Sequence, residues 1–327
     1  MSLPKIALLA TGGTIAGRGS NPAKATEYRP GMVGIDELLE AVPALLDIAE
    51  IQAEQFANLP SSALLHSDLL RMAQHINELL ADDSISGVVI THGTDVMEET
   101  AYFLNLTVKS PKPVVITGSM RPSTAISADG PMNMIEAVRV AVHPDSIGMG
   151  VLLVLNDEIH AARDVTKSNA QRLHTFVSRE LGPLGIITGD QIDYYRKSLR
   201  EHTYQTDFDV TALHELPRVD MFTTHIGADG VAIDAFVAAG AKGIVIAAAG
   251  AGATTPGMRE ALTRAEEAGV RICFATRTGS GTIRGGRPGS TLIAAGNLNP
   301  YKARFLLALA LAHSDDNAQI QDWFNRY

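Results

Sequence analysis

Two threonines flank a pair of glycines directly after the first apolar stretch of the chain. Residues 6–10 read Ile-Ala-Leu-Leu-Ala and lead into Thr11, Gly12, Gly13 and Thr14. Glycine permits backbone angles closed to other residues and lets a ligand approach the main chain. A threonine hydroxyl becomes a nucleophile once a base removes its proton. The turn lacks the GxxxxGK[ST] and GxGxxG spacings of phosphate-binding loops, so a structural glycine bend and a catalytic turn both fit this segment.

A second polar cluster, THGTD over residues 91–95, follows the apolar residues 87–90. His92 and Asp95 alone are too few ligands for a metal site, and we expect no cofactor. A threonine or aspartate at this place also serves as an ordinary helix N-cap. The cluster therefore fits either a helix start or a group of reactive side chains.

A third cluster, RDVTK over residues 163–167, follows the apolar segment 150–155. Charged loop residues are usually solvated, and this segment alone fits that description. If it converges with the other two clusters, however, the Lys167 ammonium would favour loss of a proton from a threonine hydroxyl. Nucleophilic catalysis without cysteine requires such a convergence.

Apolar stretches alternate with helical patterns through the first half of the chain, which predicts βαβ units and a largely parallel, doubly wound α/β sheet. The strand segments are continuously apolar, as expected where helices cover both faces. Ligands gather beyond the carboxyl ends of such strands, where all three clusters fall. The predicted strands are residues 6–10, 87–91, 113–118 and 150–155, and the predicted helices are residues 35–46, 98–106 and 131–142.

The second half predicts a smaller α/β domain. Residues 189–217 turn polar and aromatic with weak periodicity, which indicates an interdomain connection. The expected division is residues 1–190, a linker at 191–216, and residues 217–327. Beyond the linker, the predicted strands are residues 219–223, 243–249 and 270–275, and the predicted helices are residues 234–239, 257–268 and 300–312.

The composition favours a small-molecule partner. The 327 residues are 46% hydrophobic and 19% charged with a formal net charge of −9, and no basic block is interleaved with aromatics, which argues against nucleic-acid binding. Cys273 is the only cysteine, so an intrachain disulfide and a CxxC motif are excluded. No apolar run reaches the roughly 18–20 residues of a membrane span. The start as written lacks an export signal, which fits a cytoplasmic protein, whereas a processed chain would fit the periplasm.

Together the clusters closely resemble those of bacterial L-asparaginases of the type II and glutaminase-asparaginase group. The resemblance extends over nearly the whole chain in the order of that family. The matching stretches are ATGGTIAG from Ala10, ITHGTDVMEETAYFLNLTVK from Ile90, MRPSTAISADGPMN from Met120, RDVTKSN from Arg163, GPLG from Gly182 and NLNPYKAR from Asn297.

The resemblance implies a homotetramer, a dimer of dimers, whose sites form between the amino-terminal domain of one subunit and the carboxy-terminal domain of its neighbour. It implies that Thr14 is the nucleophile, that Tyr28 pairs with it, and that Thr94, Asp95 and Lys167 form a second catalytic group. Ser61 would hold the substrate α-carboxylate. The implied substrate contacts are Gly13, Ser61, Ser62, Thr94, Asp95 and Ser119.

The implied mechanism is double displacement: Thr14 attacks the amide carbon, ammonia leaves, and water activated near Thr94 and Lys167 hydrolyses the aspartyl ester. Backbone N–H groups near the strand ends would stabilise the oxyanion. An unaided threonine hydroxyl is a poor nucleophile, so either Tyr28 or the Lys167-polarised Thr94 must take its proton. The sequence leaves both open.

Three positions depart from the family pattern around the substrate amino group. Ser62 stands where Gln or Glu is common, the region 278–289 has no acidic residue, and residues 250–253 lack the family's nearby Asn. Asp95 is then the main counter-ion for the substrate ammonium. We expect weaker asparagine affinity or an altered preference among asparagine, glutamine and related amides. Arg284 or Arg287 could meet a second carboxylate on another substrate, or be solvated surface residues.

Other functions stay open at this stage. The chain could act on a peptide or within a tRNA-dependent amidotransferase, although no appended domain or basic surface supports this. It could also be a catalytically silent amino-acid-binding protein, because the amino-group contacts are altered while the other motifs persist. A nucleotide-binding protein is disfavoured by the missing phosphate-loop spacing.

Overall fold

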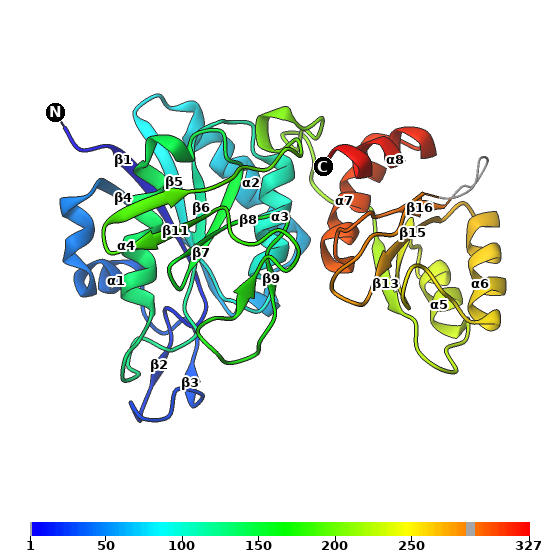
Figure 1. Cartoon of the computed structure of the whole chain (residues 1–327), viewed down its shortest axis with the longest axis horizontal. Helices are drawn as coiled ribbons and strands as arrows, with labels where there is room; N and C mark the ends of the chain where they lie inside the picture. The colour runs from blue at the N-terminus through cyan, green and yellow to red at the C-terminus, as the bar shows by residue number, and fades with distance from the viewer. Residues whose placement is uncertain (1, 286–291) are drawn as a thin grey trace. The chain divides into compact units, whose positions relative to one another are not determined.

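The computed structural model describes residues 2–285 and 292–327. The chain forms two compact units, Met1–Gln205 with Asp209–Thr211, and Thr206–Phe208 with Ala212–Tyr327. Each unit has its own sheet flanked by helices (Figure 1). This confirms the prediction of a larger amino-terminal and a smaller carboxy-terminal α/β domain.

An eight-stranded sheet forms the first unit, in the order β12-β11-β8-β7-β6-β5-β1-β4. The five strands from β7 to β4 are parallel, and the remaining three pair antiparallel. The prediction of a largely parallel sheet therefore holds for the part that carries the clusters. The strands are β1 (Lys5–Gly12), β4 (Glu50–Leu59), β5 (Ile85–Thr91), β6 (Val114–Thr117), β7 (Val151–Leu155), β8 (Glu158–Ala161), β11 (Gly185–Thr188) and β12 (Gln191–Tyr194).

Helices cover both faces of this sheet (Figure 1). Alternate residues of β1, such as Ile6 and Leu8, belong to one core with α1 (Ile35–Ala41) and α4 (Gly130–Val142). The intervening Ala7 and Leu9 are equally buried because strand side chains alternate between faces. The other face is covered by α2 (His66–Ala81) and α3 (Met97–Thr107). Since α3 and α4 lie on opposite faces, the β5–α3–β6 and β6–α4–β7 crossovers have opposite hands, an exception to the right-handed rule.

The chain order of the sheet reverses between β1 and β5. From β1 the chain moves outward to β4, returns across β1 to β5, and continues to β6 and β7. In open α/β sheets the carboxyl ends of the strands on either side of such a reversal diverge into loops on opposite faces and leave room for a ligand. The turns after β1 and β5 are those that contain Thr14 and Thr94.

Two short hairpins extend from the unit beyond this strand end. β2 (Arg18–Gly19) pairs with β3 (Tyr28–Arg29), and β9 (Thr166–Lys167) pairs with β10 (Phe176–Val177). These hairpins carry Tyr28 and Lys167. No strand was predicted in either place, because two-residue strands leave no periodic pattern.

The second unit contains a four-stranded parallel sheet in the order β13-β14-β15-β16. Its core includes Ile244, Ile246 and Ile272 from the strands, with Met258 and Leu262 from α6. The strands are β13 (Val219–Thr223), β14 (Gly243–Ala248), β15 (Arg271–Thr276) and β16 (Ile293–Ala294), and the helices are α5 (Val231–Ala238), α6 (Pro256–Glu267), α7 (Pro300–His313) and α8 (Asn317–Arg326).

Several elements differ from the sequence predictions. The helix expected at residues 35–46 ends at Ala41, because Pro43 has no N–H to donate and restricts Val42; a 3₁₀ helix, Pro43–Asp47, follows. The expected linker begins with β12, which pairs with β11. The predictions also omitted β4, α2 and α8. No helix in the described ranges is long and apolar enough to cross a membrane.

Candidate active site

The turns after β1 and β5 touch through their backbones. Gly13 has φ +80°, and a Cβ placed there would lie 2.4 Å from the Cα of Gly93. Only glycine combines this left-handed conformation with so close an approach. The two glycine turns therefore bring the segments that contain Thr14 and Thr94 side by side, and the catalytic role of the first turn stays a prediction.

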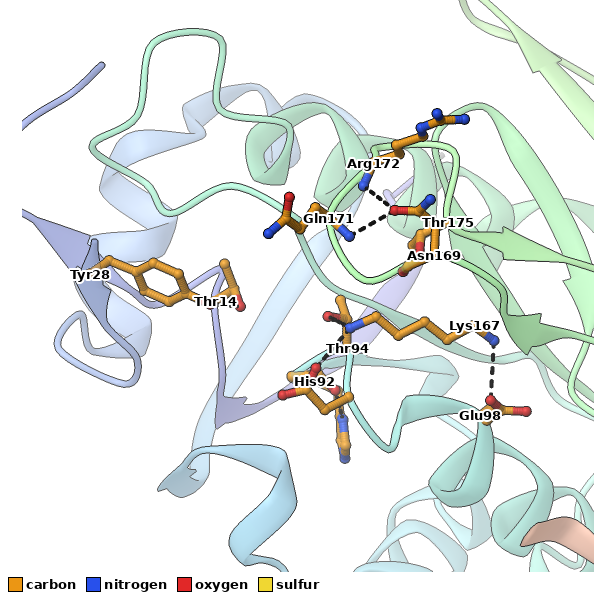
Figure 2. Close-up of polar contacts among 12 residues, drawn as sticks. Thr14, Tyr28, His92, Thr94, Glu98, Lys167, Asn169, Gln171, Arg172 and Thr175 are labelled. Carbon is orange, nitrogen blue, oxygen red and sulfur yellow. Dashed lines mark hydrogen bonds and ion pairs between the residues drawn. The ribbon is translucent and has the colours of Figure 1, made fainter. Parts of the chain in front are cut away.

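Thr14 forms a pair with Tyr28. The Oγ1 atom of Thr14 lies 2.7 Å from the Oη atom of Tyr28, and Figure 2 shows the phenol ring pointing at the threonine. Thr14 is 8% exposed, so its hydroxyl is largely shielded from water. The loop that carries Tyr28 is tied back to the turn by a hydrogen bond from the Gly31 N–H to the Gly13 carbonyl, 3.2 Å long. The contact places a second hydroxyl on the candidate nucleophile.

Lys167 connects the other two clusters. Its Nζ atom donates to Oγ1 of Thr94 at 2.9 Å (Figure 2). The same atom donates to Oδ1 of Asp95 at 2.8 Å. The Lys167 side chain is 14% exposed, whereas that of Asp95 is 72% exposed. A shielded ammonium within hydrogen-bond distance stabilises negative charge on the Thr94 oxygen. The structure thus brings together Thr94, Asp95 and Lys167 as one group.

Glu98 is a site residue that the sequence analysis did not assign. Its Oε1 atom accepts a hydrogen bond from the backbone N–H of Lys167 at 3.1 Å (Figure 2). The same oxygen accepts a hydrogen bond from Oγ1 of Thr166 at 3.0 Å. Glu98 lies in the first turn of α3 and is 7% exposed. This carboxylate holds β9 at the start of α3. Because Lys167 belongs to β9, its backbone is held at the same place. The available signal was an acidic residue three positions after Asp95, in the first turn of the predicted helix.

The predicted substrate contacts occupy different environments. Ser61 is buried beside Gly93: a Cβ on that glycine would lie 2.7 Å from Oγ of Ser61. Ser62 is exposed in the same short 3₁₀ helix, Ser61–Ala63. Ser119 is fully buried and its hydroxyl donates to the carbonyl of Arg121 at 2.7 Å, so that hydroxyl is engaged. Substrate binding by these serines stays a prediction.

His92 has a structural role. The imidazole is fully buried, with Nδ1 2.7 Å from the Gly93 carbonyl oxygen and Nε2 3.1 Å from Oγ1 of Thr100. Burial lowers its pKa to about 4, so the ring is neutral at physiological pH. Among the described residues, no group of three or more His, Cys, Asp or Glu side chains is arranged to hold a metal ion.

Part of the region that departs from the family pattern lies outside the described residues. This holds for Arg287 and residues 286–289, while Arg284 is exposed. Thr276 and Thr278 form a hydroxyl pair at 2.9 Å at the carboxyl end of β15. These residues belong to the second unit.

The fold and the geometry define a class of protein: an α/β protein with two hydroxyl centres, each paired with a proton-carrying side chain, at adjacent parallel strand ends. Residues 5–200 match the family model "Asparaginase, N-terminal", and residues 218–324 match "Glutaminase/Asparaginase C-terminal domain". The chain belongs to the asparaginase family.

Similar proteins cover its whole length. L-asparaginase 2 of Bacillus subtilis is 49% identical over 327 residues, which cover 99% of this chain and 87% of the relative. The probable periplasmic L-asparaginase of Haemophilus influenzae is 42% identical and is covered to 93%, with 99% of this chain aligned. The crystal structure of the probable cytoplasmic L-asparaginase from Campylobacter jejuni has a TM-score of 0.96 at 42% identity and is covered completely, as is this chain.

Proposed function

We propose that this protein is an L-asparaginase, an amidohydrolase that converts L-asparagine to L-aspartate and ammonia. The observation that carries the proposal is the 2.7 Å contact between the hydroxyls of Thr14 and Tyr28, beside the Lys167–Thr94 pair. The names of the relatives support the substrate, and the site geometry supports the chemistry. One relative is named as cytoplasmic and another as periplasmic, and both are 42% identical to this chain. The compartment therefore does not follow from the family.

In the first step, Oγ1 of Thr14 attacks the side-chain amide carbon of the substrate. The threonine proton passes to Oη of Tyr28, and the phenolic proton passes on to the departing nitrogen, which leaves as ammonia. Of the two bases that the sequence left open, Tyr28 is favoured because its oxygen contacts Oγ1 of Thr14 directly. An aspartyl ester on Thr14 remains.

In the second step, water attacks the ester carbon. It gives a proton to Oγ1 of Thr94 as the Thr94 hydroxyl proton passes to the departing Thr14 oxygen, and the Lys167 ammonium stabilises negative charge on the Thr94 oxygen during this transfer. The ester C–O bond breaks, the Thr14 oxygen regains a proton, and aspartate leaves. The exposed carboxylate of Asp95 is oriented by the same lysine and is available to the substrate ammonium.

We also propose that the substrate amino group is held less tightly than is common in this family. Ser62 offers a short, neutral hydroxyl in place of a longer amide or carboxylate. Asp95 is then the principal counter-charge for the substrate ammonium. A charge-assisted hydrogen bond contributes more than a neutral one. We expect a raised KM for asparagine or a measurable rate on glutamine. The assembly we propose is a homotetramer, which analytical ultracentrifugation would test.

An ammonia-release assay on asparagine, glutamine and related amides tests the function, with calorimetric binding measured in parallel. Asparaginase activity predicts turnover of asparagine that is lost in Thr14→Ala. Binding of asparagine without ammonia release would favour an amino-acid-binding protein instead. Turnover confined to other amides would assign a different substrate to the same chemistry.

A further inference from the structure

Glu158, His160 and Ser178 form a polar cluster next to the β10 end of the β9–β10 hairpin, in which His160 and Ser178 are buried and Glu158 is partly buried. The Nδ1 atom of His160 lies 3.0 Å from Oγ of Ser178, and its Nε2 atom lies 3.1 Å from Oε2 of Glu158. The Nε2 contact has the distance of an ion pair without the alignment of a hydrogen bond. A fourth residue, His174, approaches the same Glu158 oxygen at 3.5 Å.

A carboxylate, an imidazole and a serine in series are the components of a hydrolytic triad. His160 is 0% exposed and Ser178 is 5% exposed, and their contact joins two elements of the same unit. We therefore consider a role of the cluster within the protein itself.

Both ring nitrogens of His160 face a polar partner. Nε2 lies beside the Glu158 carboxylate, and Nδ1 shares a hydrogen bond with the Ser178 hydroxyl, whose direction depends on the tautomer of the ring. The pKa of the Glu158 carboxyl is lowered, chiefly by the His160 imidazole and further by His174. An ionised carboxylate on one side of the ring and the Ser178 hydroxyl on the other thus favour one orientation of the imidazole.

The cluster joins strand β8 of the large sheet to the short β9–β10 hairpin. His160 belongs to β8, whose residues pair with β7 and β11 inside the eight-stranded sheet. Ser178 directly follows β10, in which Phe176 pairs with Lys167 and Val177 pairs with Thr166. A hairpin of two-residue strands has too few hydrogen bonds to fix its own position. The contact between His160 and Ser178 supplies an attachment to the sheet.

We propose that Glu158 and His160 are positioning residues for the reaction. They hold Ser178, and through it the β9–β10 hairpin, so that the Lys167 ammonium stays within hydrogen-bond distance of Thr94. Glu98 holds one strand of the hairpin, and His160 holds the other. The inference rests on the proposed function, because it requires Lys167 to take part in turnover.

The test compares asparagine turnover of Ser178→Ala, His160→Leu and His160→Asn. Leucine keeps the volume of the ring but removes both contacts, and asparagine keeps a hydrogen-bonding atom where Nδ1 lies. We expect kcat to fall about tenfold in Ser178→Ala and His160→Leu, with KM for asparagine changed less than about twofold, because a misplaced catalytic group lowers the rate more than the affinity. His160→Asn should recover most of kcat.

Controls separate this effect from loss of folding and from failure of the proposed function. Ser84→Ala and His214→Leu are matched changes at exposed positions and should leave kcat unchanged. If His160→Leu fails to fold, kcat of Ser178→Ala still tests the positioning role. If kcat is unchanged in Ser178→Ala while Lys167→Met is inactive, the positioning role of Glu158 and His160 is wrong and the proposed function stands. Wild-type kcat in Lys167→Met would overturn the role proposed for Lys167 and the inference with it.

Discussion

The Nζ atom of Lys167 lies 2.9 Å from Oγ1 of Thr94, although the two residues are 73 positions apart in the chain. Thr94 follows a central parallel strand, whereas Lys167 comes from a two-residue strand outside the sheet. The geometry of the proposed second catalytic group therefore depends on the position of the β9–β10 hairpin as well as on the sheet.

Replacing Lys167 tests the proton-transfer role of this pair. Lys167→Met keeps the length of the side chain but removes the charge, so we expect kcat for asparagine to fall between about 10²- and 10⁴-fold, the range typical of a lost acid–base group. Lys167→Arg keeps the charge with a different geometry and should lie between the methionine variant and the wild type. A near-normal rate in the methionine variant would remove Lys167 from the mechanism.

Tyr28→Phe tests which group takes the Thr14 proton. The substitution removes only the Oη atom that contacts Oγ1 of Thr14. We expect kcat to fall by about 10²-fold or more, with a smaller change in KM. If Tyr28→Phe retains most activity while Thr94→Val does not, the Lys167-polarised Thr94 is the base and the assignment to Tyr28 is incorrect.

The position of the turns after β1 and β5 at one edge of the sheet was predictable. Continuously apolar strands indicate a parallel sheet, and the carboxyl ends of parallel strands lie at the same edge. The candidate role of Lys167 came from its polar cluster and that of Tyr28 from the resemblance, although the hairpins that carry them leave no periodic pattern. Glu98 and the Glu158–His160–Ser178 cluster were missed, since their partners are fixed only by tertiary packing. Helix α2 had a readable signal that was overlooked: Leu69, Ala73, Ile76 and Leu80 recur at helical spacing and are buried.

Ser62→Gln tests the account of substrate affinity. A longer amide at this exposed position can reach the substrate amino group, so we expect KM for asparagine to fall by about threefold to tenfold, the effect of roughly one hydrogen bond. The values of kcat and KM for asparagine and glutamine should be measured together. An unchanged KM for both amides would show that Ser62 does not limit binding.

Glu136 on α4 makes stability depend on pH. The residue is 2% exposed, and burial, together with the neighbouring Asp157 carboxyl, raises its pKa to about 7 from the ordinary value of 4.5. The folded protein then binds a proton more tightly than the unfolded chain. The contribution of Glu136 to stability is therefore full below pH 4.5, falls as the pH rises from 4.5 to 7, and stays reduced above 7.

Glu136→Gln removes this loss and should stabilise the protein at pH 8 by about 1–3 kcal/mol. The gain should shrink at pH 5, where Glu136 is mostly protonated. Urea midpoints at the two pH values and one protein concentration would measure it, with Glu40→Gln on the exposed face of α1 as the control. A gain of equal size at both pH values would exclude ionisation of Glu136 as its cause.

The central claim is that Thr14 is the nucleophile, and the rate of ammonia release from asparagine by Thr14→Ala tests it most directly. Thr14→Ser keeps a hydroxyl at the same carbon and serves as the matched variant, and circular dichroism verifies that both are folded. We predict that Thr14→Ala loses at least about 10³-fold in kcat while Thr14→Ser retains measurable turnover. Near-normal ammonia release by folded Thr14→Ala would contradict the account.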